Sequence, residues 1–504
     1  MGVLPANGLL YSSPYSCTCS SGEMIPGLNA YSSLPNIKKS SDPITVNISV
    51  QLEKGPAYGS VKKLPISDGD WPTYRENSAR AGVNRTTIYG TLKENWKAKL
   101  PGTPSSIISV GNSVFVADVQ AHTLYSIAAD TGKISWSYTT DGRVDSPPTY
   151  YKGLLLFGSN DGWVYCLRAR DGVLAWRFRD LPKRLIHADG QLESAWPIFG
   201  SVLVHKDKLY FSAGRSTFVD GGIFVYCLNP INGELIKKRN VYGPFKKGSS
   251  FPLSSKNTSH KGGFLNDILV AKGDTIYLRH RAFDLNLDDT DKIEAHIMPL
   301  SSFLDGNQQH RTGWIINNKF NWWQAGVKDI LVMEGTECYA IQGFPTFGNH
   351  SYFDPRRQNY QLVGGPVSYV FNDKSKGTGK KKKKGKKGKK KKGNSAPEPM
   401  VSSGVGWKTD LPSNCKAIAK AGSTIFLAGA PMKFEDKSFE NYVKAYKGKL
   451  GGSIIAVSAE DGKIISEIKL DAAPVWDSLI VANERLFIAL NDGSIRCFSG
   501  DLRK

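Results

Sequence analysis

The chain contains two consecutive segments that follow one pattern, NSVFVADVQAHTLYSIAADTGKISW (Asn112–Trp136) and GLLLFGSNDGWVYCLRARDGVLAW (Gly153–Trp176). Each predicts an apolar strand, a polar turn, a short alternating strand, a second polar turn and a third strand that ends in Trp. The NDG sequence at residues 160–162 favours a tight hairpin. The second turns contain Gly132 and Gly172, which can take a positive φ. We therefore expect each segment to form a small antiparallel sheet.

The same pattern recurs along the rest of the chain. Trp96, Trp136 and Trp176 are spaced 40 residues apart. Looser copies lie at residues 208–236, 452–468 and 485–500, degenerate copies at 274–285 and 328–343, and part of another at 8–32. A period near 40 with about four strands per unit is typical of a β-propeller. We predict an all-β chain that forms a seven- or eight-bladed β-propeller of four-stranded blades.

The repeat divides the chain of 504 residues into three parts. Residues 1–65 are expected to hold a partial blade and a linker, the remnant of an upstream segment, because GLLY at residues 8–11 is typical of the middle of a strand. Residues 66–504 are expected to form the propeller. Since the N-terminal end looks truncated, the closure of the ring is left open at this point.

Residues 374–395 form a lysine-rich insertion between two repeats. The thirteen lysines from Lys374 to Lys392 account for most of the net charge of +21, and without them the charge is +8. The tract has no aromatic residue for stacking on bases, so we expect a disordered insertion without specific nucleic-acid binding. Lys380–Lys392 should still make non-specific, salt-sensitive contacts with polyanions.

The repeat AADTGKISW (Ala128–Trp136) resembles that of bacterial pyrroloquinoline-quinone (PQQ) enzymes and of the propeller lipoprotein of outer-membrane assembly. DWPTYRENSARAG (Asp70–Gly82) resembles the opening of many bacterial PQQ-like propeller proteins. ESAWPIFGSVLV (Glu193–Val204) and GLLYSSPYSCTC (Gly8–Cys19) are similar to segments of planctomycete-type proteins of that group. The resemblance implies a quinoprotein-like propeller and favours a periplasmic or exported protein. The sequence shows no signal peptide and no stretch that would span a membrane, so the compartment remains open.

The tryptophans of the repeat are expected to be structural. Trp96, Trp136 and Trp176 should cap the last strand of one blade and pack on the next, because a large aromatic ring at a repeated position usually fills a repeated core. Cys166, Cys227 and Cys497 share one position in three copies, so we expect buried thiols that cannot reach one another.

The resemblance to quinoproteins implies a site that this sequence does not match. That family typically has a vicinal Cys-Cys pair, an aromatic floor, Glu, Asn and Asp around calcium, and a carboxylate base. No Cys-Cys pair and no C-x-x-C-H haem motif occurs here, and the nearest feature is Cys17-Thr18-Cys19, whose role stays open. We expect no catalytic residue and no metal site, and these features lean towards a protein without enzymatic activity.

The middle copies have the longest hairpins and could form a pocket. Polar and aromatic residues on loops are more often functional than those in strands. The candidate ligand-binding residues are Glu193, Trp196, Arg215, His310, Arg311 and Trp314. The alternative is that these residues make contacts at hairpin tips and between blades.

Three functions are consistent with these features. The first is a non-catalytic PQQ-like propeller that acts as a scaffold or binding module for protein partners, as part of a larger envelope or exported protein. The second is a divergent PQQ-dependent alcohol or sugar dehydrogenase, and only this one implies PQQ and calcium as cofactors. The third is polyanion binding through the lysine tract.

Overall fold

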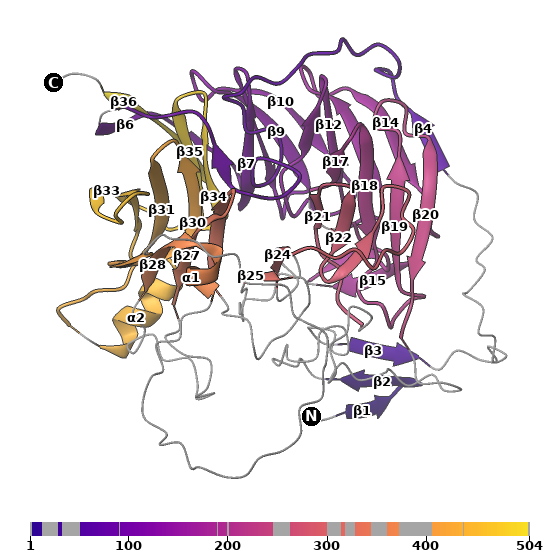
Figure 1. Ribbon diagram of the computed structural model, residues 1–504. Helices are drawn as coiled ribbons and strands as arrows, with labels where there is room; N and C mark the ends of the chain where they lie inside the picture. The colour runs from indigo at the N-terminus through magenta and orange to yellow at the C-terminus, as the bar shows by residue number, and fades with distance from the viewer. Residues whose placement is uncertain are drawn as a thin grey trace, which may run out of the picture.

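The computed structural model is a β-rich molecule whose sheets are arranged around a common axis (Figure 1). It describes residues 3–12, 29–32, 51–89, 91–188, 190–198, 201–244, 263–299, 314–317, 328–343, 360–371, 406–436 and 438–501. Within these residues no helix combines the length and the apolar character needed to cross a membrane. Cys17, Cys19 and the lysine insertion lie outside the described residues.

The two best copies of the repeat form antiparallel four-stranded units, as predicted. The first has the order β10-β9-β8-β7, from β7 (Pro104–Val110), β8 (Ser113–Asp118), β9 (Thr123–Ala128) and β10 (Ile134–Thr139). The second contains β11 (Thr149–Tyr151), β12 (Leu154–Gly158), β13 (Val164–Arg168) and β14 (Leu174–Arg179). Every residue of β7 is buried, whereas β10 is mostly exposed or half-buried, so the first strand of a unit is the inner one.

The second sheet has a fifth strand that the repeat did not predict. It is β4 (Gln51–Lys54), which pairs antiparallel with β14 at the outer edge. The domain boundary expected at residue 65 therefore falls after a strand that already packs with the propeller, because QLEK is too short and polar to show the repeat pattern. Further towards the N-terminus, a separate sheet contains β1 (Val3–Ala6), β2 (Leu9–Ser12) and β3 (Asn29–Ser32).

The sheets from the middle of the chain are less regular. One has four strands, β17 (Leu203–His205), β18 (Lys208–Ala213), β19 (Ile223–Leu228) and β20 (Leu235–Val241). The next two contain β21 (Leu269–Lys272), β22 (Thr275–Leu278) and β23 (Arg281–Phe283), then β24 (His296–Pro299) and β25 (Trp314–Asn317). The hairpin β15 (Leu185–Ala188) and β16 (Gln191–Ser194) is inserted between β14 and β17.

The last part of the chain returns to the regular pattern. One sheet contains β26 (Ile330–Glu334), β27 (Glu337–Gln342), β28 (Gln361–Pro366) and β29 (Trp407–Asp410), with α1 (Val367–Phe371) after β28. The next contains β30 (Ser413–Ala421), β31 (Thr424–Pro431), β32 (Gly452–Ser458) and β33 (Ile464–Leu470), with α2 (Phe439–Tyr446) inserted between β31 and β32. The final sheet contains β34 (Pro474–Ala482), β35 (Arg485–Leu490) and β36 (Ser494–Asp501).

The ring is closed by a strand from the start of the repeat region. Strand β6 (Thr91–Lys99) pairs antiparallel with β36 along its whole length and places Trp96 opposite Cys497. The inner strand β34 of this last sheet contacts β7 of the first. Closure removes the free edge that an open array of sheets would present. The all-β propeller is thus confirmed, while the blade count of seven or eight stays a prediction.

Four tryptophans connect neighbouring sheets in the same way. Trp96 Nε1 donates to the carbonyl oxygen of Ala129 at 2.9 Å. A carbon of the Trp96 ring lies only 2.7 Å from the position that a Cβ on Gly132 would occupy. The same pair of contacts joins Trp136 to Ala169 and Gly172, Trp176 to Ile231 and Gly233, and Trp407 to Ala459 and Gly462. Each turn glycine has a positive φ, so it serves both the turn and the close approach of the ring.

Residues 70–84 cross the centre of the ring at one end of its axis. Trp71 pairs with Ser109 next to the end of β7, and the carbonyl of Pro72 accepts from Tyr150 of β11. Further along, Ser78 accepts from Ala271 of β21, and Ala81 accepts from Met333 of β26. Finally β5 (Val83–Asn84) runs parallel to β30. We call residues 70–84 the hub segment, because it contacts inner strands around the whole ring.

Buried charged side chains hold the hub segment in place. Arg75 Nη1 donates to Asp477 Oδ2 at 2.9 Å, and Tyr74 Oη donates to the same oxygen at 2.6 Å. Arg80 is fully buried and donates to the carbonyl oxygens of Tyr74 at 2.9 Å and Leu269 at 3.2 Å. Burial lowers the pKa of Arg80 to about 10. These contacts tie sheets from opposite parts of the sequence to one central segment.

Candidate functional site

The end of the ring opposite the hub segment carries the loops that join the sheets. Tyr150 on β11 contacts the hub segment, and β12 runs antiparallel to β11, so Asn160 at the end of β12 lies at the other end of the axis. The inserted hairpin β15–β16 lies over this end. It is anchored to the turn between β8 and β9, where Gln191 Oε1 lies 2.6 Å from His122 Nε2 and Gln191 Nε2 donates to Gln120 at 2.5 Å.

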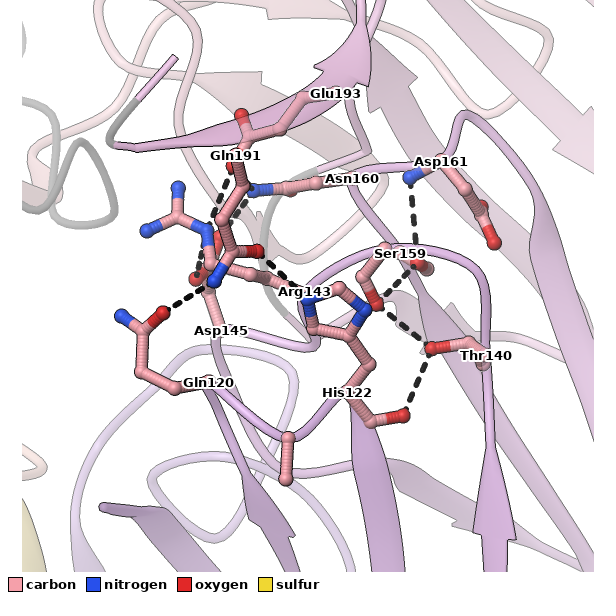
Figure 2. A network of polar contacts seen from close by, with 12 residues as sticks. Gln120, His122, Thr140, Arg143, Asp145, Ser159, Asn160, Asp161, Gln191 and Glu193 are labelled. Atoms are coloured by element: carbon pink, nitrogen blue, oxygen red, sulfur yellow. Dashed lines mark hydrogen bonds and ion pairs between the residues drawn. The ribbon is translucent and has the colours of Figure 1, made fainter. Parts of the chain in front are cut away.

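Beneath the hairpin, a buried ionic cluster joins two loops to strand β16 (Figure 2). Arg143 Nε lies 2.7 Å from Glu193 Oε1 of β16 and 3.7 Å from Asp145 Oδ1. The side chains of Arg143, Asp145 and Glu193 are 5%, 7% and 4% exposed. Such a pair retains its charges only when a partner and hydrogen bonds replace the lost water. We call Arg143, Asp145, Asn160 and Glu193 the four-residue cluster.

Asn160 completes this cluster. Its Nδ2 donates to Asp145 Oδ2 at 2.9 Å and to Glu193 Oε1 at 3.2 Å, so one amide bridges both carboxylates. Its backbone carbonyl also accepts from Ser194 of the hairpin at 2.7 Å. The Oδ1 atom of Asn160 is buried and has no hydrogen-bond partner among the described residues. Two carboxylates and one guanidinium leave the cluster with a formal charge of −1.

The predicted pocket residues fall into separate places. Glu193 belongs to the four-residue cluster, and Trp196 lies close by, just after β16. Trp196 Nε1 donates to the carbonyl oxygen of Asp220 at 2.7 Å, and Arg215 Nη2 donates to the carboxylate of the same residue at 2.9 Å. Arg184 donates to Asp220 as well, at 2.9 Å. Trp196 and Arg215 thus meet at one aspartate, and they tie the hairpin to the β17–β20 sheet.

Trp314 is not part of this group. It is 1% exposed, and the guanidinium of Arg75 in the hub segment lies 4.7 Å from its ring centre. It belongs to the apolar core around β26, whereas Trp196 belongs to the core around β12. His310 and Arg311 lie outside the described residues. The structure therefore brings together Glu193, Trp196 and Arg215, and it places Trp314 in a core position.

Arg143, Asp145, Asn160 and Gln191 were not anticipated from the sequence. Asn160 was interpreted only as a turn residue, because NDG is a common hairpin signal. Arg143 and Asp145 lie in DGRVDSP, a loop between two strands that shows no motif. No sequence signal marked these residues, because their burial depends on the hairpin β15–β16 that covers them in the folded chain. Among the described residues, no three or more His, Cys, Asp and Glu side chains are grouped so that they could hold a metal ion.

Part of the chain is similar in sequence to other known proteins. A family model described as outer membrane protein assembly factor BamB matches residues 89–259. The dehydrogenase subunit of the quinone alcohol dehydrogenase of Gluconobacter oxydans is 26% identical over 191 residues, which cover 33% of this chain and 24% of that protein. Tetrathionate hydrolase of Acidithiobacillus ferrooxidans is 22% identical over 131 residues, covering 26% of this chain and 22% of that protein.

Comparison with solved structures agrees with the sequence match. The quinohemoprotein alcohol dehydrogenase of Comamonas testosteroni superposes with a TM-score of 0.52 at 12% identity, covering 86% of this chain and 81% of that one. The fold is a PQQ-like β-propeller. A europium-containing methanol dehydrogenase matches this propeller with a TM-score of 0.50 at 11% identity, covering 86% of this chain and 98% of that one. In sequence, the match spans about a quarter of the length of the quinone dehydrogenase relative.

Proposed function

We propose that this propeller is a non-catalytic scaffold or binding module for protein partners, as part of a larger envelope or exported protein. The observation that carries the proposal is that both carboxylates of the four-residue cluster are buried and already have partners within it. Arg143 lies between the carboxylates of Glu193 and Asp145, and Asn160 donates to both. Neither carboxylate is presented to an incoming substrate as a general base would have to be.

The same residues do not favour the alternative, a PQQ-dependent dehydrogenase. Calcium prefers six to eight oxygen ligands with carboxylates turned towards it. Here the guanidinium of Arg143 takes the place next to Glu193 that a cation would need. The vicinal cysteine pair of the resembled enzymes has no counterpart in the sequence. These residues therefore do not fit a calcium-bound quinone.

A titration of the purified chain with PQQ and calcium tests the proposal. Quinone absorbance and the melting temperature are followed together, because a ligand that binds the folded state raises the melting temperature. We expect no saturable change in either signal up to high micromolar quinone. Binding of one equivalent with a rise in melting temperature would contradict the proposal. Glu193→Gln provides the control, since loss of that binding in the variant would assign it to the four-residue cluster.

The lysine tract supports a second function that can be separated from the first. Most of the net charge of the chain lies in this single run, so polyanion binding should depend on it alone. Deleting residues 377–392 removes eleven lysines. We expect the deleted chain to elute from heparin at much lower salt with an unchanged melting temperature. Unchanged elution would instead assign polyanion binding to the folded surface.

A further inference from the structure

The outermost strand of the β30–β33 sheet has an apolar open edge. No described strand pairs with the outer side of β33. Its first two residues, Ile464 and Ile465, are 45% and 60% exposed. Natural proteins usually protect such edges, because unpaired backbone groups beside apolar side chains are a template for another strand. The outer edge of β33 therefore has the properties of a docking surface for an extended chain.

The equivalent edge of the β11–β14 sheet is already occupied. Strands β14 and β33 both follow an Asp-Gly turn, and both have a bulge at their second residue, Ala175 in β14 and Ile465 in β33. At β14, strand β4 pairs antiparallel with the edge, and Ala175 is only 2% exposed. The carbonyl oxygen of Ala175 accepts from the amide of Gly55, the residue after β4, at 2.8 Å. The molecule thus shows on β14 how an added strand covers an edge of this kind.

Side-chain pairs match β4 to β14. Arg177 donates to Glu53 of β4 at 2.7 Å, and Arg179 donates to Gln51 at the same distance. An apolar residue of each strand lies between these two contacts. Opposite charges that face each other across two strands stabilise the pairing, whereas like charges oppose it. The polar–apolar–acidic order of β4 therefore complements the basic–apolar–basic order of the edge that it covers.

The same positions of β33 have a different charge order. Counted from the bulge, Glu467 takes the place of Arg177. Lys469 takes the place of Arg179, and an isoleucine lies between the two residues of β33. Glu467 and Lys469 are both exposed, and they form an ion pair with each other at 2.6 Å. A strand added in the register of β4 would need a basic residue opposite Glu467 and an acid or amide opposite Lys469.

Two other outer edges are less suited to strand addition. On β20, Lys238 is paired with Asp180 and Arg239 with Asp289, and charged residues along an edge oppose pairing with another chain. Strand β10 has an exposed Ile134 but no charged residue, so it offers no charge pattern to a partner. The combination of an apolar start and exposed opposite charges distinguishes β33 from these two strands.

We propose that β33 binds an extended segment of a protein partner, which adds to the sheet as an antiparallel strand. The segment has an acidic, an apolar and a basic residue in consecutive positions, followed two residues later by glycine at the bulge. Backbone hydrogen bonds supply the affinity of such a contact, and the alternate side chains supply its specificity. This inference rests on the proposed scaffold role, and it names the surface and the chemistry of the partner.

Two fluorescent peptides of identical composition test the proposal on the intact chain. Val-Glu-Leu-Lys-Thr-Gly-Pro-Ala has the expected charge order, and Val-Lys-Leu-Glu-Thr-Gly-Pro-Ala has the two charges exchanged. Because their net charges are equal, the lysine tract should treat both alike. We expect the first peptide to bind at least about fivefold more tightly in a fluorescence anisotropy titration. Hydrogen exchange should show that it protects residues 464–470.

A charge-exchange variant of the protein provides the matched control. The double variant Glu467→Lys/Lys469→Glu keeps an ion pair within β33, so its melting temperature should be unchanged and its peptide preference should be reversed. Equal binding of both peptides to the wild type, or an unchanged preference in the double variant, would overturn the proposal. Self-association that is lost in Ile465→Asp, measured by sedimentation velocity, would also overturn it and identify the occupant as a second copy. The quinone titration does not involve this edge, so the scaffold role can fail separately.

Discussion

The two ends of the propeller axis each contain a buried arginine, and the two arginines are used differently. Arg80 at the hub end donates to carbonyl oxygens and a hydroxyl group, and no carboxylate contacts it in the described residues. Arg143 at the opposite end lies between two carboxylates, that of Asp145 in its own loop and that of Glu193 on β16. Backbone carbonyls move only with the backbone that carries them, whereas side-chain carboxylates can change rotamer. The position of Arg80 is therefore set by the backbone, whereas that of Arg143 depends on the mutual placement of side chains.

The largest expected effect is at the hub. Arg80→Met should lower the free energy of unfolding by about 4 kcal/mol, because several buried acceptors around the ring lose their donor. Thermal or urea unfolding measures the loss. Arg85→Ala is the control, since Arg85 is exposed in the same part of the chain, and it should change stability by less than about 0.5 kcal/mol. Equal effects of both variants would show that the hub contacts do not support the ring.

Substitutions in the four-residue cluster should lower the free energy of unfolding less than Arg80→Met does. The effects of its residues on stability should not be additive. Arg143→Met leaves two buried carboxylates without their cation and should cost about 3 kcal/mol. Adding Glu193→Gln removes one of those charges, so the double variant should recover part of the loss. A double-mutant cycle measured by urea unfolding should give a coupling energy of about 1–3 kcal/mol. Additive effects would mean that the arginine and the glutamate act independently.

The third prediction concerns how much the contact between a tryptophan and a turn glycine of neighbouring sheets contributes to stability. Gly132→Ala should cost about 2–3 kcal/mol, because the turn has a positive φ of 72° and the new methyl group would meet the ring of Trp96. Gly111→Ala shares the positive φ but has no atom within 4 Å, so it should cost only about 1 kcal/mol. Thermal unfolding measures both. If the two losses are equal, the tryptophan contact contributes nothing beyond the turn.

The last expected effect depends on pH. Burial raises the pKa of Asp329 to about 7, so the folded chain holds this proton more tightly than the unfolded chain does. Stability from this group is present at low pH and is lost as pH rises from about 4 to about 7. Asp329→Asn cannot ionise, so it should gain about 4 kcal/mol on the wild type between pH 4 and pH 8, because the shift spans about three pH units. Urea unfolding at several pH values measures the difference.

The control for this prediction lies at the other end of β26. Glu334 is paired with Lys420, so Glu334→Gln should show no comparable gain as the pH rises. A gain of equal size in both variants would point to a general charge effect rather than to the buried carboxyl of Asp329. Together the two variants compare the two ends of one inner strand.

Much of the architecture could be predicted from the repeat. The strands, their turns and the spacing of Trp96, Trp136 and Trp176 depend on residues close together in sequence, and local patterns report such contacts. Trp407 makes the same contact with Gly462, but it was missed because its copy is interrupted by the lysine insertion. The all-β class and the propeller followed from these signals. The ring closure did not, because β6 and β36 come from distant parts of the chain.

The candidate site could be predicted only in part. Glu193, Trp196 and Arg215 were chosen because long hairpins often hold functional residues, and the structure brings these three into one region. Arg143 and Asp145 have no local signature, since their burial depends on a hairpin inserted almost 50 residues later in the sequence.

The sequence determined which segments of the regular repeats become strands and where they turn, because these features depend on side-chain periodicity and turn chemistry within about one repeat. The tertiary structure decided which charged groups meet. Tyr74 and Asp477 are 403 residues apart in sequence, and yet they share a hydrogen bond at the centre of the ring. Burial and partner choice are properties of the assembled ring, and they shift the pKa values of Arg80 and Asp329.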